Sequence, residues 1–413
     1  MPSKSASDST PGWGFRTKLR RASFGWRGSH AAIARIDAAV VEILAAARRD
    51  SVLAAEGAVL FLEKVSPAVC EVDSSSGALG NAAYYAVEAL VPIIVAASVP
   101  ETVRSKWLER LFNALQDDDP PYIESLGDHW GDLCVTTGIA SRWADDLLPL
   151  VKHVVADRRR GVFAFTKGTC ACYSALFKAG RHEELLGLLD LDEHPIWRYL
   201  AWGGRVLVSR GQVDEAIAYM QRRSGINVPL GALARFAEDA LLGVGRRADA
   251  YARYAIDSNQ GNSRIATFRA LGRKYPEIGA DRLLADLIAS TPGEEGKWFA
   301  TAKSLQRFDL AIALARQSPC DPKTLNRAAR DHLESRPEFA AEAALAALHW
   351  IAHGYGYEIT GVDVMQAHRL TQEAAVSCGR TEQVRSRVEA VLAGDGSATK
   401  WMRAMLGAQN PAV

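Results

Sequence analysis

The chain has 413 residues, of which 48% are hydrophobic and 23% charged, as expected for a folded protein with a sizeable core. Lys and Arg number 49 against 48 Asp and Glu, so the net charge is +1. This balance excludes a bulk attraction to nucleic acid or to an anionic membrane, and any such binding would need a local basic patch.

Two further features predict a cytoplasmic location. The six cysteines are sparse and lie mostly in apolar helical runs, which favours free thiols in a reducing compartment. The N-terminus has no apolar signal region, and the most apolar run, residues 86–99, is shorter than the roughly 20 residues that a membrane span needs. We therefore expect no membrane association.

Residues 1–29 differ in composition from the rest of the chain, with frequent Ser, Pro and Gly and a single acid, Asp8. Four aromatic residues are interleaved with cations there. The cations include Arg16, Lys18, Arg20, Arg21 and Arg27. The segment is predicted to be a flexible tail whose aromatic residues pack on the first helices. Two alternatives stay open: an arm that binds a nucleic-acid strand or an acidic partner, and a transit peptide.

Residues 30–160 are predicted to form an N-terminal helical domain. Apolar residues recur at helical spacing in five or six segments, the most apolar of which, residues 81–97, is expected to be deeply buried. Asp117-Asp118-Asp119-Pro120-Pro121 ends one of these helices. Arg158-Arg159-Arg160-Gly161 is a basic helix stop, and we place the domain boundary just after it.

Residues 161–413 are predicted to form C-terminal helical repeats. The segment around which they are organised, residues 197–221, reads as two antiparallel helices joined at Ser209-Arg210-Gly211-Gln212. Similar turns occur at Gly180 and Gly245, 31 and 34 positions away, and weaker copies follow near residues 271, 306 and 379. A helix pair cannot bury both apolar faces alone, so the pattern predicts an all-α solenoid of stacked antiparallel helix pairs, similar to tetratricopeptide or HEAT repeats.

Two levels of resemblance follow from these motifs. Residues 166–392 resemble degenerate tetratricopeptide repeats, although no unit carries the full consensus. Val72-Asp73-Ser74-Ser75-Ser76-Gly77 and residues 107–118 resemble segments of an uncharacterised bacterial family of helical-repeat proteins, some of which are linked to SWIM zinc modules. The resemblance implies a fold and little about an activity.

The motifs that could hold a metal are incomplete. Cys170-Ala171-Cys172 supplies half of a SWIM site, but no Cys-x-His follows it. His349 and His353 stand one helical turn apart, as in a zincin, yet Trp350 occupies the place of the catalytic Glu. We predict no metal and no cofactor; a metal-dependent hydrolase using these two histidines is the weakest alternative.

Other polar motifs are read as turns or loops. Gly243-Val244-Gly245 matches part of a dinucleotide-binding pattern but follows a helix and coincides with a repeat turn. Residues 117–119 could bind a divalent cation. The neighbouring prolines favour the other interpretation, in which these acids belong to an ordinary loop. Asp128-His129-Trp130 with Asp132 could line a groove or form a solvated helix face.

We expect a non-enzymatic interaction module that binds a protein or peptide partner on its concave surface. Four aromatic residues are candidate anchors for the partner: Trp197, Tyr199, Trp202 and Tyr219. Their alternative role is packing between helices. The alternative function is nucleic-acid binding by the N-terminal arm together with a basic groove. The groove would contain Arg158, Arg159, Arg160, Arg222 and Arg223.

Overall fold

The computed structural model describes residues 12–193, 195–225 and 228–407. The described residues form helices and connecting loops without a β-strand, which confirms the all-α solenoid prediction. The chain divides into two compact units between Pro229 and Leu230. Each unit has its own hydrophobic core.

Most of the first unit consists of paired helices, preceded by a single 3₁₀ turn, η1 (Gly14–Thr17). The first helices are α1 (Ser29–Ala47), α2 (Ser51–Val69), α3 (Ala78–Ala96) and α4 (Glu101–Gln116). A 3₁₀ turn, η2 (Glu124–His129), leads into α5 (Trp130–Cys134) and α6 (Thr137–Arg159). The remaining pairs are α7 (Thr169–Lys178) with α8 (His182–Leu191) and α9 (Trp197–Ser209) with α10 (Val213–Arg223).

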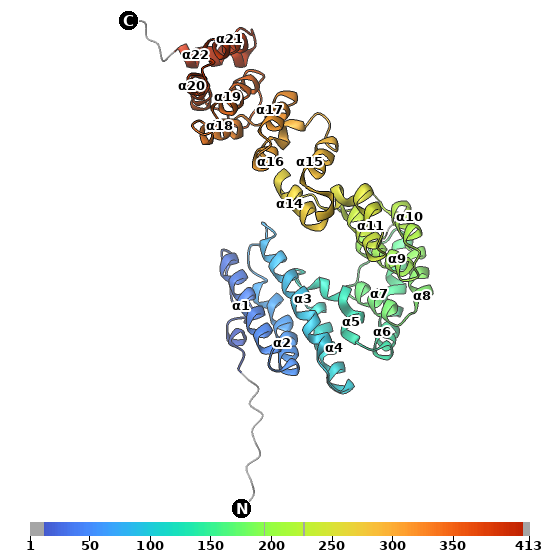
Figure 1. The fold of residues 1–413 in the computed structure, drawn as a ribbon. Coiled ribbons are helices and arrows are strands. Elements are labelled where there is room, and N and C mark those ends of the chain that lie inside the picture. Colours follow the sequence, from blue (N-terminus) through green and yellow to red (C-terminus); the bar gives the residue numbers. More distant parts are fainter. Residues whose placement is uncertain (1–11, 194, 226–227, 408–413) are drawn as a thin grey trace, which may run out of the picture. The chain divides into compact units, whose positions relative to one another are not determined.

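The helices of the first unit form two rows. Each odd-numbered helix from α1 to α9 packs against the next odd-numbered one, while α2 contacts α4 and α6 contacts α8. In Figure 1 the odd-numbered row lies on the inner side of the curve that this unit describes. The row of inner helices therefore supplies the concave surface of the unit, as in other solenoids.

The N-terminal segment is folded onto the first helices from residue 12 onward, which confirms the predicted packing of most of its aromatic residues on these helices. Trp13, Phe15, Leu19 and Phe24 are buried in the first core. The indole of Trp13 fills the space above Gly57, where a Cβ would lie 2.3 Å from the ring. Aromatic burial of this size outweighs the conformational entropy of a tail. Residues 1–11 lie outside the described part.

Helix α3 is the one described helix that is long and apolar enough, by these two measures alone, to cross a bilayer. It runs for 19 residues, longer than the sequence pattern suggested. Leu79, Val87 and Leu90 on the side of α3 that faces α1 and α2 are fully buried, while Tyr84 and Tyr85 are exposed. Packing in the first core therefore accounts for the apolar residues on the side facing α1 and α2, and the expected deep burial holds for that side alone.

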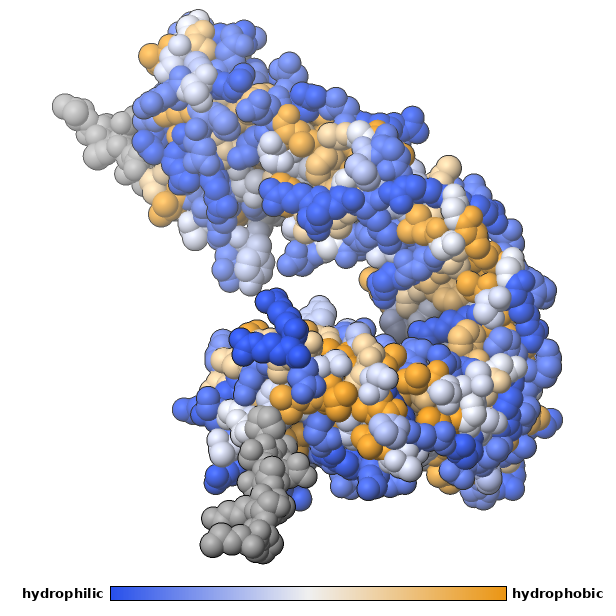
Figure 2. All heavy atoms as spheres, turned by 60° about the horizontal axis from the view of Figure 1, so that its bottom comes forward, coloured by the Kyte–Doolittle hydropathy of each residue, from blue (hydrophilic) through white to orange (hydrophobic). Residues whose placement is uncertain are grey.

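The surface of the first unit is mixed in character. In the view of Figure 2, hydrophobic residues reach the surface in patches across the middle of this unit and are bordered by hydrophilic ones. Its exposed large hydrophobic residues come from several elements, and they include Trp26, Val41, Tyr84, Tyr85 and Leu150.

The repeat turns share one geometry. Gly180, Gly211, Gly245 and Gly379 all have φ between 69° and 78°, the left-handed region that closes a helix C-terminus. In each turn the residue after the glycine donates its N–H to the carbonyl five positions earlier, for example Gln212 to Leu207 at 3.0 Å. The sequence prediction of these turns is confirmed, and Gly243-Val244-Gly245 is one of them rather than a nucleotide-binding loop.

No break in packing follows Arg160, where we expected a domain boundary. Helices α6 and α7 pack directly against each other inside the first unit. The guanidinium of Arg158 lies 2.8 Å from the buried carboxylate of Asp192. This ion pair joins the end of α6 to the end of α8 across the segment that resembled a linker. The division between units falls at Pro229 instead.

The two longest helices of the second unit lie in its C-terminal part. Its first part contains α11 (Ala232–Gly243), α12 (Arg247–Ala250), a π-helical turn η3 (Tyr251–Ala255), α13 (Ile256–Ser258) and α14 (Arg264–Lys274). Its middle part contains η4 (Pro276–Ile278), α15 (Ala280–Ala289), η5 (Glu295–Trp298), α16 (Phe299–Ser304), α17 (Phe308–Gln317) and α18 (Pro322–Asp331). Its last part contains α19 (Pro337–Ala352), α20 (Gly361–Ser377), α21 (Thr381–Leu392) and α22 (Ser397–Gly407). Helix α19 packs against α17, α18, α20 and α21 and forms the centre of the second core.

A buried carboxylate organises the start of the second unit. The side chain of Glu238 is fully buried and accepts hydrogen bonds from Ser258, Asn259, Lys274 and Tyr275. Burial alone would raise the pKa of Glu238, but these hydrogen bonds outweigh it and leave the pKa below its usual value. The carboxylate thus ties α11 to α13 and α14.

Candidate functional site

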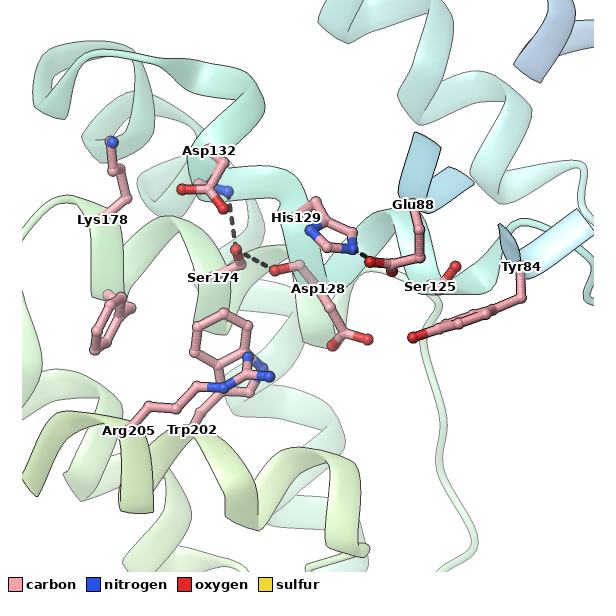
Figure 3. A pocket seen from close by; sticks show the side chains of 12 residues that line it. Tyr84, Glu88, Ser125, Asp128, His129, Asp132, Ser174, Lys178, Trp202 and Arg205 are labelled. Atoms are coloured by element: carbon pink, nitrogen blue, oxygen red, sulfur yellow. Dashed lines mark hydrogen bonds and ion pairs between the residues drawn. The ribbon is translucent and has the colours of Figure 1, made fainter. Parts of the chain in front are cut away.

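A polar pocket of about 650 Å³ lies on the inner row of the first unit. Five elements line it: α3, η2, α5, α7 and α9. Its lining residues are Tyr84, Glu88, Ser125, Asp128, His129, Gly131, Asp132, Ser174, Phe177, Lys178, Trp202 and Arg205. We call it the inner pocket (Figure 3). Its size is within the usual range for ligand sites.

The back of the inner pocket is built by a close approach of α5 to α7. A Cβ at Gly131 would lie 2.3 Å from the carbonyl oxygen of Ser174, so this position accepts only glycine without a shift of the backbone. The Ser174 hydroxyl accepts a hydrogen bond from the Gly131 N–H and donates one to the Asp128 carbonyl, both at 2.9 Å. This buried hydroxyl holds η2 and α5 onto α7 and is therefore occupied structurally.

One side of the pocket is acidic. Glu88 Oε1 lies 2.8 Å from His129 Nε2, and Asp128 Oδ2 accepts from Arg198 Nε at 2.8 Å. Partial burial, together with the nearby Glu88 carboxylate, raises the pKa of Tyr84, so its phenol stays protonated at neutral pH. The acidic side is therefore held in place by partners on its own unit.

The other side of the pocket is basic. Lys178 projects from the last turn of α7, and the guanidinium of Arg205 lies 4.3 Å from the ring centre of Trp202 on α9. Neither Lys178 nor Arg205 has a carboxylate partner among the residues that the structure describes. In Figure 3 these two cations lie on the opposite side of the pocket from Glu88 and Tyr84. Cations therefore lie on this side of the pocket, while Glu88 and Tyr84 lie on the other.

Asp132 adds an acceptor at the edge of the pocket. Its side chain is exposed and has no ion-pair partner within the described ranges. Together with Lys178 and Arg205, it gives the pocket three charged groups that the fold does not consume. Such groups can bind oppositely charged side chains of a ligand.

The four predicted anchor residues lie in different environments. Trp202 lines the inner pocket, although its side chain is almost entirely buried. Tyr199 is buried and packs edge-on against Tyr173, with ring centres 5.7 Å apart. Tyr219 packs over Gly203, where a Cβ would lie 2.6 Å from its hydroxyl oxygen. Trp197 is half-buried at the start of α9 and does not line the pocket.

Three of the five arginines of the predicted basic groove form ion pairs. Arg158 pairs with Asp192, Arg160 with Asp157, and Arg223 with Asp190 at 2.8 Å. Arg159 and Arg222 are exposed. The periodicity of the sequence did not show these acids because each lies at the end of a helix or on another helix. Nucleic-acid binding by this groove stays a prediction.

The incomplete metal motifs have structural roles. Cys170 and Cys172 are buried in α7, and burial raises the pKa of the Cys172 thiol to about 12. Burial, followed by the proximity of His353, lowers the pKa of His349, and the two rings lie 4.2 Å apart between centres. Within the described ranges no three His, Cys, Asp or Glu side chains form a metal-binding group. All six cysteines are free, as predicted.

The central carboxylate of the acidic loop at residues 117–119 is bound by backbone N–H groups that follow it in the chain. Asp118 is buried and accepts hydrogen bonds from the N–H groups of Tyr122 and Ile123 at 2.9 and 2.8 Å. Its oxygens therefore face the chain and are not available to a cation on the surface.

The sequence motif Asp128-His129 with Asp132 does line a groove, and this alternative is confirmed. Most of the remaining lining residues were missed. Tyr84, Glu88, Lys178 and Arg205 belong to helices whose apolar pattern was read only for its buried face. Uneven charge on the polar faces of α7 and α9 is the one signal that could have identified them.

The fold and the pocket together define the class of protein as a helical-repeat solenoid with a polar pocket on its inner row. No family model matches the chain, and no curated protein matches it. The resemblance to the SWIM-associated bacterial family therefore stays a prediction.

Proposed function

We propose that the protein is a non-enzymatic interaction module whose inner pocket binds a short peptide segment of a partner protein. The observation that carries this proposal is the set of three charged groups, Asp132, Lys178 and Arg205, that surround the pocket without ion-pair partners in the described structure. A stable fold does not need charged side chains without ion pairs in one pocket. Such side chains can instead bind complementary charges of a peptide.

The charges of the pocket specify the segment. An acidic side chain of the partner would lie against Lys178 and Arg205, and a basic side chain would lie toward Glu88 on the opposite side. Arg205 is already aligned on the face of Trp202, so less conformational entropy is lost when it binds a carboxylate. The pocket accommodates a few side chains, which suits a linear segment better than a folded surface.

The groups present favour binding over catalysis. The hydroxyl of Ser174 is committed to Gly131 and Asp128, so it lacks a free proton acceptor of the kind a nucleophile needs. His129 is held by Glu88 rather than by a hydroxyl or thiol of the pocket. The arrangement thus contains charge and shape for recognition without a nucleophile and base in contact.

Selection from a random peptide library displayed on phage tests this function. The wild-type protein should enrich peptides that combine acidic and basic residues. The Lys178→Glu/Arg205→Glu variant should bind those peptides about tenfold more weakly or worse. A matched control, Lys152→Glu/Arg222→Glu, reverses two exposed cations on α6 and α10 outside the pocket. Equal loss in both variants, or no enrichment by the wild type, would count against the proposal.

A further inference from the structure

A basic surface covers the N-terminal part of the first unit. The sequence contains no Asp or Glu between Asp8 and Asp37, but it contains six cations there. These cations are Arg16, Lys18, Arg20, Arg21, Arg27 and Arg35, and all six are exposed. We call them the basic surface. None of the six has an ion-pair partner in the part of the chain that the structure describes.

The backbone fixes this surface rather than leaving it as a tail. The N–H groups of Ala22 and Ser23 donate to the carbonyls of Pro67 and Ala68 at the end of α2, at 2.9 and 3.2 Å. Phe15 packs edge-on against Phe61, with ring centres 5.8 Å apart. Because the apolar side chains of the segment point inward, its cations are directed to solvent.

Helix α1 joins the same surface. Arg35 donates to the carbonyl of Lys18 at 3.3 Å, and its guanidinium lies 5.0 Å from the ring centre of Phe24. Glu42 accepts a hydrogen bond from the Gly14 N–H at 2.8 Å, and Asp73 accepts one from the Ser75 N–H at 2.9 Å, and within the described residues neither carboxylate forms an ion pair with a cation of the surface. Helix α1 thus adds its cation Arg35 to the surface of the N-terminal segment.

An exposed aromatic residue lies within the same segment. Trp26 is 67% exposed, precedes Arg27 directly, and is held through its carbonyl, which accepts from the Asp73 N–H at 2.9 Å. The other aromatic residues of the segment, Trp13, Phe15 and Phe24, are buried. Trp26 therefore offers a free indole face beside cations.

We propose that the basic surface binds single-stranded nucleic acid without sequence preference, with phosphates on the cations and a base stacked on Trp26. Proteins that bind single strands in this way place cations along the phosphate backbone and stack bases on aromatic side chains. A membrane surface fits less well, because interfacial binding needs a broad apolar face and this segment has used its apolar side chains in the core.

The magnitude of the salt effect follows from the number of cations. Six phosphate contacts on a single strand give a slope of about −4 for log K against log salt concentration. Between roughly 50 and 200 mM salt, the affinity should then fall about 300-fold. Loss of stacking on Trp26 should weaken binding by about 10-fold and leave the slope unchanged.

Fluorescence anisotropy of a labelled oligothymidylate, titrated with the full chain at several salt concentrations, tests the proposal. The Arg16→Ala/Arg20→Ala/Arg21→Ala variant should lower the steepness of the slope by about 2. The control variant Arg48→Ala/Arg49→Ala/Lys152→Ala removes three exposed cations from outside the basic surface and should bind as the wild type does. Circular dichroism melting checks that each variant is folded.

Three results would overturn the proposal. The first is an oligothymidylate affinity that is undetectable at low salt for the folded wild type. The second is an equal loss in the control variant. The third is tighter binding of polyglutamate or of phosphatidylserine vesicles than of the oligonucleotide, which would assign the surface to an acidic protein or to a membrane. Trp26→Ala with unchanged affinity would remove the stacking part and with it the preference for a single strand.

Discussion

The inner pocket of the first unit and the Glu238 network of the second unit use charge in opposite ways. Glu238 is fully buried, and each hydrogen bond that its carboxylate can accept is supplied by its own unit. Around the inner pocket, Lys178 and Arg205 are left without carboxylate partners in the described residues. A charge that is satisfied internally stabilises a fold, while a charge left open on a concave surface is available to a ligand. The same residue types therefore stabilise the fold in the second unit and, in our proposal, serve recognition in the first.

The largest effect should follow from Glu238→Ala. The substitution leaves Lys274, Tyr275 and Ser258 without their shared acceptor, and loss of one partner from a buried charged network costs about 3–5 kcal/mol. Urea unfolding followed by circular dichroism measures the change. Glu238→Gln keeps the shape and should cost less. A loss below 1 kcal/mol for the alanine variant would show that the network does not stabilise the unit.

The same carboxylate predicts a pH dependence. Because the pKa of Glu238 is lower in the folded state than in the unfolded chain, its contribution is present at neutral pH and disappears as the pH falls through the folded-state value. The stability difference between wild type and Glu238→Gln should therefore shrink on acidification below about pH 4. A difference that grows instead would contradict the assigned direction of the pKa.

An intermediate effect should follow from Gly203→Ala. The added Cβ would meet the ring of Tyr219, so α9 and α10 must separate, at a cost of about 1–3 kcal/mol. Gly187→Ala is the matched control, because this exposed position inside α8 has no atom within 4 Å of the added Cβ. The control should be neutral or gain up to about 1 kcal/mol from helix propensity. Thermal unfolding of both variants makes the comparison.

The smallest effect on stability should come from the inner pocket. Lys178→Ala and Arg205→Ala remove exposed or half-buried cations without ion-pair partners in the described residues, so each should change the free energy of unfolding by less than about 0.5 kcal/mol. Loss of peptide binding without loss of stability would separate recognition from folding. A destabilisation above 2 kcal/mol by either variant would show that these residues serve the fold.

Local patterns in the sequence predicted the fold well. The turns at Gly180, Gly211 and Gly245 were identified because a left-handed residue at a helix end favours glycine. The turn at residue 306 was weaker in the sequence because Gln306 adopts the same left-handed conformation, with φ of 59°, and hides the signal. The helix end predicted at residues 117–121 is confirmed, because α4 ends at Gln116.

Features that depend on distant residues were not predictable in the same way. The inner pocket combines residues from Tyr84 to Arg205, and their proximity results from the stacking of α3, α5, α7 and α9. The boundary expected after Arg160 does not coincide with the division between units, because the pairing of Arg158 with Asp192 across 34 residues has no local signature. Composition described the N-terminal segment as a tail, whereas the space above Gly57 that receives Trp13 exists only in the folded unit.

The most direct test of the central claim is a charge-swap titration by isothermal calorimetry. A peptide selected by the wild-type protein is compared with a version in which its acidic residues are replaced by lysine, against both the wild type and Lys178→Glu/Arg205→Glu. We expect the swapped peptide to bind the variant and to bind the wild type only weakly. The coupling energy between the peptide charges and the two pocket residues should be about 1.5 kcal/mol or more. Binding of the original peptide to both proteins with equal affinity would contradict the assignment of the inner pocket as the recognition site.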